Sequence, residues 1–351
     1  FRSDRLRRAL FEKTRVDPID IPTVADDRFA AEDTLSDELL RLIAYCCHPL
    51  LSPGAQLALT LRLACGLSVA EIADALLAEP AAIAQRIARA KKELRSAGVE
   101  LDVAPHLLIA ERLPGVLNAV YLLFNAGYLS TQHEEWLRPA LCADALRLSR
   151  LLAAHTSVSE PEAHALAALL HFAAARMPAR SDAEGRPVPL ALQDRSRWDQ
   201  SLIARGFMHF DASIAGETVT RYHIEAAIAA SHARAADMES TDWIQILGLY
   251  DQLCTLYPGP AATLNRIIAL LYARGAQEAF ASIATSHDLD SVQDSLVYHA
   301  TIGDLHASLG AHERAAQSFA NAAALAGSST LAAMFRERER AARGMIDSSG
   351  Q

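Results

Sequence analysis

Three groups of side chains in this sequence have types and spacings that could support chemistry. The first is Cys46, Cys47 and His48, which carry metal-binding atoms. Adjacent cysteines on a helix point about 100° apart, and no second CxxC or HxxxH motif lies nearby to complete four ligands, so we interpret the triplet as core packing. The second is His164 and His171, one helical face among apolar neighbours, which we interpret as buried histidines with satisfied hydrogen bonds.

The third group is cationic. At about 100° per residue, one face of a helix near residues 80–95 carries five small, polar or basic residues: Ala82, Gln85, Arg86, Arg89 and Lys92. The major groove of DNA admits such a helix, whose first turns reach base edges while later basic residues meet phosphates. Ala82 permits close approach. We expect Gln85 to contact a base edge, Arg86 and Arg89 to read guanine or bind phosphate, and Lys91, Lys92 and Arg95 to hold phosphates.

The preceding residues supply the elements that would position this face. Ser68 can cap a helix that begins at Val69, and Glu71 completes a capping box. Pro80 suits the first turn of a second helix, which we expect to run to about Arg95. Its apolar positions form a single stripe: Ile83, Ile87, Ala90 and Leu94. The pattern predicts a helix-turn-helix, and the competing interpretation is an amphipathic helix with a solvated basic face.

Composition predicts an all-α protein whose DNA contact lies near its beginning. Hydrophobic residues make up 51% of the 351 residues, Leu and Ala dominate, and no period-2 strand run stands out. The first 100 residues hold 14 Lys and Arg against 15 Asp and Glu, whereas the rest hold 19 against 27, a net charge of −8. An acidic surface repels a polyanion. Scattered cysteines and the lack of a membrane-length apolar run lead us to expect a cytoplasmic location without membrane partners.

Breaks in the helical pattern divide the chain. Residues 1–33 read as a basic helix end with an acidic, Pro-containing linker, and 34–100 as the helix-turn-helix block. A middle helical domain is expected over 107–177, and a last helical domain over 198–343 after a Pro-rich connection. The opening FRSDRLRRALFEK lacks the apolar core of a signal peptide and reads as the tail of something longer.

The last domain carries a repeat-like pattern. The segment LVYHATIGDLHASLGAHERAAQSFANAAALAG has its small and aromatic residues at tetratricopeptide spacing: Gly303, Gly310, Ala315, Phe319 and Ala322. Looser copies lie around Gly275 and around Tyr250 to Pro258. The fold class we expect is therefore all-α, with a helix-turn-helix domain, a helical domain and tetratricopeptide-like helical repeats. The alternative for the last domain is a generic bundle of helical hairpins.

Taken together, these motifs resemble region four of extracytoplasmic-function RNA polymerase sigma factors, in the group with a tetratricopeptide-like C-terminal extension. The likeness is carried by YCCHPLLSP, QLALTLRLACGLSVAEIA and AQRIARAKKELR, and then by ERLPGVLNAVYLLFNAGYLS, DRSRWDQSLI, IEAAIAASHA and TDWIQILGLYDQL. It implies a region that reads the −35 promoter element and contacts the polymerase β flap, with promoter DNA and the RNA polymerase core as partners. Region two is absent from this sequence except that DRLRR, Asp4 to Arg8, resembles its last turn.

Two segments of the extension are candidates for a regulatory or partner contact. Asn125 and Tyr128 belong to an Asn-Ala-Gly-Tyr segment where the family has Asn-Glu-Gly-Tyr, so a role of that glutamate does not carry over. The segment QDRSRWD brings together Arg195, Arg197 and Trp198. For both segments a structural role is an equal alternative, as a turn in the first and as ion pairs that tie down the connector in the second.

The function that follows is a sigma factor that directs RNA polymerase to promoters. We expect its extension to pack against the helix-turn-helix and regulate it, with acidic groups that partly screen Arg86 and Arg89. The alternative is an extension that instead aids polymerase engagement. For the whole protein, the alternative is a helical-repeat protein-interaction module whose helix-turn-helix is structural. No G-x-S-x-G, Walker or GxGxxG motif occurs, so we expect no enzyme and no cofactor or metal.

Overall fold

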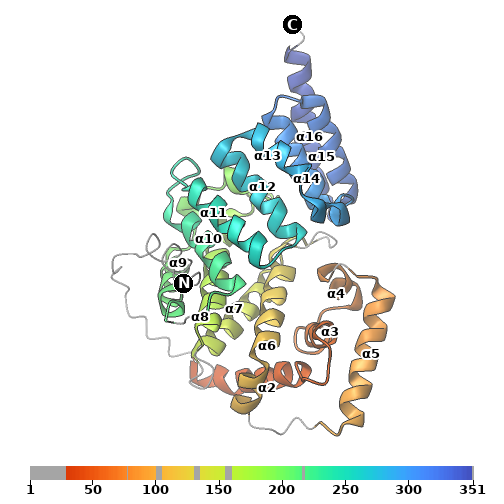
Figure 1. Ribbon diagram of the computed structural model, residues 1–351, viewed down its shortest axis with the longest axis vertical. Helices are drawn as coiled ribbons and strands as arrows, with labels where there is room; N and C mark the ends of the chain where they lie inside the picture. The colour runs from red at the N-terminus through yellow and green to blue at the C-terminus, as the bar shows by residue number, and fades with distance from the viewer. Residues whose placement is uncertain are drawn as a thin grey trace.

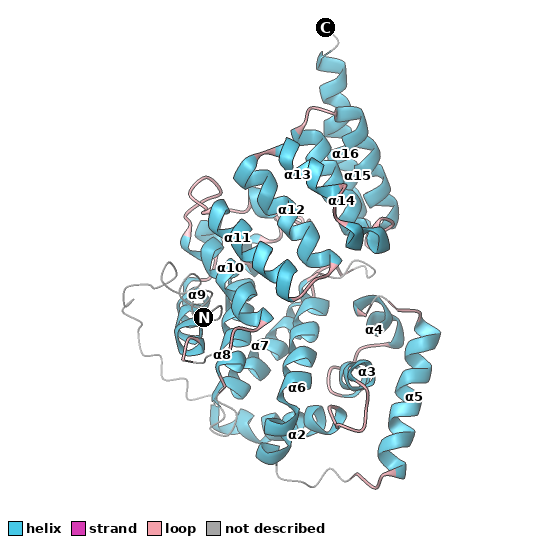
Figure 2. Ribbon diagram, viewed as in Figure 1, coloured by secondary structure: helices cyan, strands magenta, loops and turns pink. Residues whose placement is uncertain are grey.

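The protein is built from helices in the part of the chain that the structure describes. The computed structural model describes residues 29–76, 78–99, 105–129, 135–154, 160–215 and 218–349. Figure 2 shows helices and loops but no strand in these ranges. The only extended pairing within them is an isolated antiparallel bridge between Ser181 and Pro187. The predicted all-α class is confirmed for them. The expected basic helix end, with Asp4 to Arg8, and most of the expected linker lie outside the described residues. None of the described helices is long and apolar enough to cross a membrane.

Four helices form the first part: α2 (Phe29–Cys46), α3 (Pro53–Leu63), α4 (Val69–Ala75) and α5 (Pro80–Ser96). Both α3 and α5 begin with proline, whose missing N–H would have no partner in a first turn. The start of α2 at Phe29 lies inside the segment expected to be a linker, because FAAEDTL contains good helix formers and no Pro or Gly. Helix α5 lies at the edge of the molecule against α3 and α4 (Figure 1).

The next helices pack directly onto this first part. They are α6 (Pro105–Tyr128), α7 (Pro139–Ala154), α8 (Pro161–Ala175) and α9 (Gln200–Ser213). Helix α6 contacts α2, α3 and α4. One hydrophobic core runs from Leu40 through Leu94 to Leu166. Since burying one such side chain contributes roughly 1.5–3 kcal/mol, the two parts are held together by the same interactions that fold each of them.

The connection between α8 and α9 is compact. It contains three short 3-10 turns: η1 (Met177–Ala179), η2 (Leu190–Leu192) and η3 (Arg195–Arg197). Asp199 caps α9 by accepting from the amides of Ser201 at 2.9 Å and Leu202 at 3.0 Å. The Asp199 amide donates to the Ala175 carbonyl at 2.9 Å, so both ends of the connection are tied together.

The C-terminal part is a succession of helical hairpins that extends away from α6 (Figure 1). Its elements are α10 (Arg221–Arg234), α11 (Trp243–Leu256), α12 (Pro260–Arg274), α13 (Ala276–Ile283), η4 (His287–Val292), α14 (Leu296–Ser308), α15 (His312–Leu325) and α16 (Ser329–Ser349). Helices α14 and α15 cross closely at Gly303, where a Cβ atom would collide with the Phe319 ring. The turn between them uses Gly310, whose φ of 71° favours glycine.

Candidate nucleic-acid interface

Helix α5 is held on its scaffold by a single apolar stripe. Its buried residues are the four expected from their spacing: Ile83, Ile87, Ala90 and Leu94. They belong to the same core as Leu59 and Leu61 of α3 and Ile72 of α4. The predicted stripe is therefore confirmed, and the opposite face of α5 is left to solvent.

The capping box in front of α4 is formed in both directions. The Glu71 amide donates to Ser68 Oγ at 3.2 Å, and the Ser68 amide donates to Glu71 Oε2 at 2.6 Å. The preceding turn is closed by Arg62, whose Nη1 donates to the Leu67 carbonyl at 2.8 Å. Gly66 has a φ of 68° there, a conformation that suits glycine. These local contacts fix the start of α4 and confirm the expected cap.

The outward face of α5 carries most of the residues expected to meet DNA. Five of them are exposed: Ala82, Gln85, Arg89, Lys92 and Arg95. The alanines between them, Ala81, Ala84 and Ala88, are also exposed, so the first turns present little side-chain bulk. Such a surface can approach a groove closely, with amide and guanidinium groups that match base edges and phosphates.

Arg86 and Lys91 occupy the flanks of α5 rather than its outward face. Both are half-buried. The Arg86 Nη1 atom would lie 3.3 Å from a Cβ on Gly54, which puts the guanidinium beside the start of α3. Arg86 therefore lies closer to the core than the outward position expected for it.

The arginines in the middle of α5 form no ion pair in the part of the chain that the structure describes. Among the described residues, no hydrogen bond or ion pair joins an acidic side chain to Arg86 or Arg89. The screening of these two residues expected from the charge balance is thus not seen there as direct contact. Unpaired exposed arginines and lysines keep their full attraction for a polyanion.

An ion pair joins the helix-turn-helix to the extension. Arg138, just before α7, donates through Nη1 to Glu71 Oε1, the second oxygen of the capping carboxylate. Partial burial raises the pKa of Glu71, but the Ser68 hydrogen bonds and the Arg138 charge outweigh it and hold that pKa below its usual value. Arg112 of α6 donates to the Ala44 carbonyl of α2 at 2.6 Å. The orientation of α4 thus depends on residues far away in the chain.

Asn125 and Tyr128 lie at the C-terminal end of α6. The Tyr128 ring stacks on Phe124 with centroids 5.2 Å apart, and the Arg180 guanidinium covers it at 3.6 Å from the ring centroid. Arg180 also donates to the Tyr128 carbonyl. The Asn125 carbonyl accepts from the Leu129 amide at 3.1 Å, which continues the helix to its end. The side chain of Tyr128 is thus engaged within the fold.

The segment QDRSRWD contributes Arg195, Arg197 and Trp198, and each of these side chains lies in a different environment. Arg195 is buried and donates to the carbonyls of His232 and Ala235, both at 2.9 Å, at the end of α10. Arg197 is exposed and donates to the Pro178 carbonyl. Trp198 is buried between the connection and the helices. The connection is tied down as one alternative expected, but by hydrogen bonds to backbone carbonyls rather than by ion pairs.

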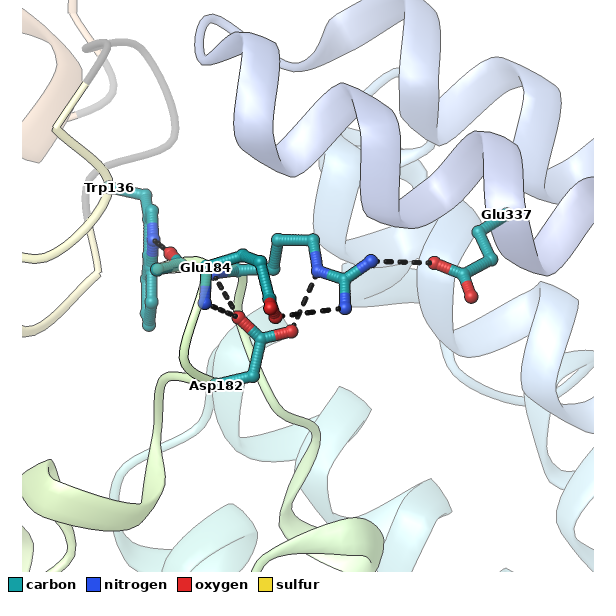
Figure 3. A network of polar contacts seen from close by, with 6 residues as sticks. Trp136, Asp182, Glu184 and Glu337 are labelled. Atoms are coloured by element: carbon teal, nitrogen blue, oxygen red, sulfur yellow. Dashed lines mark hydrogen bonds and ion pairs between the residues drawn. The ribbon is translucent and has the colours of Figure 1, made fainter.

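A turn at residues 182–186 of the connection contacts Trp136, between α6 and α7, and also Glu337 of α16. Arg186 pairs with Asp182, Glu184 and Glu337 of α16 at N–O distances of 2.7, 3.4 and 3.9 Å. These three acidic residues are labelled in Figure 3. On the other side of the turn, the Trp136 indole donates to the Gly185 carbonyl at 3.1 Å. The Arg186 pairs are exposed and contribute little to stability, so the buried Trp136 is the firmer of the two contacts.

The cysteine triplet is structural. Cys46 and Cys47 are buried in the core, and burial raises the pKa of the Cys46 thiol to about 12 and that of Cys47 to about 11. The His48 Nδ1 atom accepts from the Leu50 amide at 3.2 Å. No group of three or more His, Cys, Asp or Glu side chains among the described residues could hold a metal ion.

The two histidines of α8 face a third one. His164 Nδ1 lies 3.1 Å from His209 Nδ1, and the rings of His171 and His209 have centroids 5.0 Å apart. His171 bonds the Ala167 carbonyl at 2.7 Å through Nδ1, but its buried Nε2 has no partner among the described residues. The expectation of satisfied hydrogen bonds fails for that atom, and His164, which was also expected to be buried, is half-buried. Burial lowers the pKa of His171 to about 4 and that of His209 to about 3.

Several side chains that organise this architecture were not found from the sequence. They act across long separations or from loops: Arg112, Arg138, Arg180 and His209. No spacing rule links Arg138 to Glu71, because the two lie 67 residues apart. For the arginines, only their position in the sequence could have indicated such contacts. An arginine inside an apolar helix or next to a helix start is often buried, and a buried charge needs a partner.

Comparison with known proteins assigns the chain. Residues 41–94 match sigma-70, region 4, and residues 112–214 match a family of unknown function, DUF6596. An uncharacterized protein of Rhizobium meliloti (strain 1021) is 38% identical over 339 residues, which cover 95% of this chain and 79% of that protein. The chain belongs to the family of that protein. No solved structure matches it.

Region 4 corresponds to the end of α2 through most of α5, and DUF6596 to most of α6 through α9. A sigma-70 region 4 is a DNA-binding domain of transcription factors and not an enzymatic one. Helix α5, which carries the exposed cationic face, is thus the second helix of a helix-turn-helix in a domain of this type. The Arg138–Glu71 pair joins region 4 to the DUF6596 segment.

Proposed function

We propose that this protein is a sigma factor that recruits RNA polymerase to promoters and reads the −35 element through α5. The observation that carries the proposal is the exposed, unpaired cationic face of α5 behind a capped scaffold helix, within a region 4 match. A contact of region 4 with the polymerase β flap and a cytoplasmic location are parts of the same proposal.

Within this proposal the residues of α5 divide by position. Gln85 and Arg89 on the outward face contact base edges, and Ala82 lets the helix approach. Lys92 and Arg95 follow on the same face and bind phosphates. Arg86 and Lys91, on the flanks, reach phosphates on either side of the groove.

The test uses the full chain with RNA polymerase core and a set of promoters that differ only in the −35 element. Gln85→Ala and Arg89→Ala should each cost about 1–3 kcal/mol on the preferred element and relax discrimination at one position. Lys92→Ala should weaken all elements alike. The exposed α16 arginine Arg336 gives the control Arg336→Ala, which should change nothing. Unchanged binding by all three α5 variants would remove α5 as the reader.

We propose further that the extension controls region 4 from within the same chain. Support comes from the shared core and from Arg138, which touches the capping carboxylate of α4. Asn125, Tyr128, Arg195, Arg197 and Trp198 contribute by shaping the extension and its contacts. In this proposal α11–α16 form tetratricopeptide-like repeats, a role supported by the close crossing at Gly303.

The control function is tested by Arg138→Ala, in the intact chain with polymerase core. Cutting the chain after α5 would expose the shared core, so a point variant is the cleaner probe. A change in promoter binding or in polymerase binding supports control by the extension. Equal affinities in both assays, at low and at high salt, would contradict it.

A further inference from the structure

A group of buried polar atoms without partners lies where the connection meets α10. The group, here called the Trp198 cluster, consists of Arg176, Arg195, Trp198 and His232. Each contributes one buried nitrogen with no hydrogen-bond partner among the described residues: Arg176 Nε, Arg195 Nε, Trp198 Nε1 and His232 Nδ1. Buried polar groups are nearly always paired in folded proteins, so four unpaired nitrogens in one place need an explanation.

The Trp198 ring lies beside both guanidinium groups, and Arg195 is bonded to the backbone of His232. The guanidinium carbon of Arg195 lies 5.1 Å from the centroid of the Trp198 ring, and that of Arg176 lies 5.5 Å from it. Arg195 Nη1 donates to the His232 carbonyl at 2.9 Å, which fixes α10 against the connection. The other Arg195 donors are used by Thr241 Oγ1 and by the Ala235 carbonyl, so Nε remains. The side chain of Arg176 forms no hydrogen bond or ion pair with any described residue.

The cluster carries positive charge, and no described carboxylate is bonded to either of its guanidinium groups. Arg195 feels the charge of Asp237, yet the Asp237 carboxylate is exposed and accepts from Ser240. Burial and the charges of both arginines lower the pKa of His232 to about 3. Two neighbouring guanidinium groups, one of them buried, are costly unless an anion compensates them.

The chemistry of the free atoms defines the ligand class. Arginine Nε and tryptophan Nε1 can only donate, and an imidazole nitrogen can donate in the matching tautomer. A group that only accepts hydrogen bonds and carries negative charge complements all four. We propose that the Trp198 cluster binds a small oxyanion, a carboxylate or phosphate group, inside the extension. This site is separate from the α5 face, and the proposal does not depend on DNA reading.

The test measures binding of inorganic phosphate and of acetate to the full chain, by calorimetry and by thermal unfolding at constant ionic strength with chloride as the reference. We expect saturable binding of at least one probe, with a rise in Tm that chloride does not give. Which probe binds distinguishes a phosphate ligand from a carboxylate ligand. Arg176→Gln should weaken that binding at least tenfold and leave the fold intact, since Arg176 has no hydrogen bond to lose.

Trp198→Phe is the second variant, because it removes the free indole N–H and keeps an aromatic ring under the arginines. It should also weaken binding at least tenfold. Arg197→Gln, the exposed neighbour outside the cluster, is the matched control and should bind as the wild type does. No saturable binding of either probe, or equal binding by Arg176→Gln and the wild type, would overturn the proposal and leave water as the partner of these nitrogens.

Discussion

Arg138 and Glu71 form an ion pair in which the acceptor is also the capping residue of the scaffold helix α4. One Glu71 oxygen accepts from its own turn and the other accepts from the extension. The pair is partly shielded, with side-chain exposures of 28% for Arg138 and 15% for Glu71. The same carboxylate therefore sets the start of α4 and anchors region 4 to DUF6596.

The two variants of this pair should differ in stability. Glu71→Ala removes the cap and the ion pair, so its free energy of unfolding should fall by about 2 kcal/mol, whereas Arg138→Ala should cost about 1 kcal/mol. Denaturant unfolding of both single variants and of the double variant measures this. The double variant should resemble Glu71→Ala alone, and full additivity would show that the two residues do not interact.

Local features of the site could be read from the sequence, and distant ones could not. The stripe of α5 and the Ser68–Glu71 box depend on residues within a few positions, where helix periodicity and capping rules apply. The expected outward position of Arg86 was wrong, because angular spacing alone did not show that its guanidinium would lie beside Gly54 at the start of α3. Arg138 has no such local rule, since chain topology alone brings it to Glu71.

The connection between α8 and α9 shows the same limit. Its prolines and charges correctly indicated a break between helices, but not that Arg195 would be buried at the end of α10. Ion pairs were one expectation for this connection because QDRSRWD contains both acidic and basic residues. In the structure Arg195 donates to backbone carbonyls instead. These carbonyls are available because the last carbonyls of a helix have no partner within it.

Replacing glycine by alanine should have opposite effects at the close crossing of α14 and α15 and at an open position in α11. Gly303→Ala should lower the free energy of unfolding by more than about 1 kcal/mol, because its Cβ would collide with Phe319. Gly248 of α11 has nothing within 4 Å of its Cβ position, so Gly248→Ala should raise the free energy of unfolding by about 0.5–1 kcal/mol. Thermal unfolding compares them. A stable Gly303→Ala protein would contradict the packing of this hairpin.

The buried His171 of α8 predicts loss of stability in mild acid. The pKa of His171 is lowered to about 4, mainly by burial and also by Arg150 and Arg205, whereas an unfolded histidine has a pKa of about 6.5. Between these values the unfolded chain binds more protons, so stability is full above pH 6.5 and falls as pH drops toward 4. The slope from one such histidine is at most about 1.4 kcal/mol per pH unit.

The variant that checks this is His171→Gln, followed by denaturant unfolding at several pH values between 7 and 5. Its unfolding free energy should fall less steeply with decreasing pH than that of the wild type. His287→Gln, at an exposed position, is the control and should keep the wild-type slope. Parallel curves for His171→Gln and the wild type would show that His171 is not the titrating group.

The most direct test of the central claim is the salt dependence of duplex DNA binding by the full chain. The account predicts that the logarithm of affinity falls linearly with the logarithm of salt concentration, and that Lys92→Ala lowers the magnitude of the slope by about 1. Arg336→Ala, on α16, should leave the slope unchanged. A slope near zero for the wild type, or the same slope for Lys92→Ala, would contradict α5 as the DNA-binding surface.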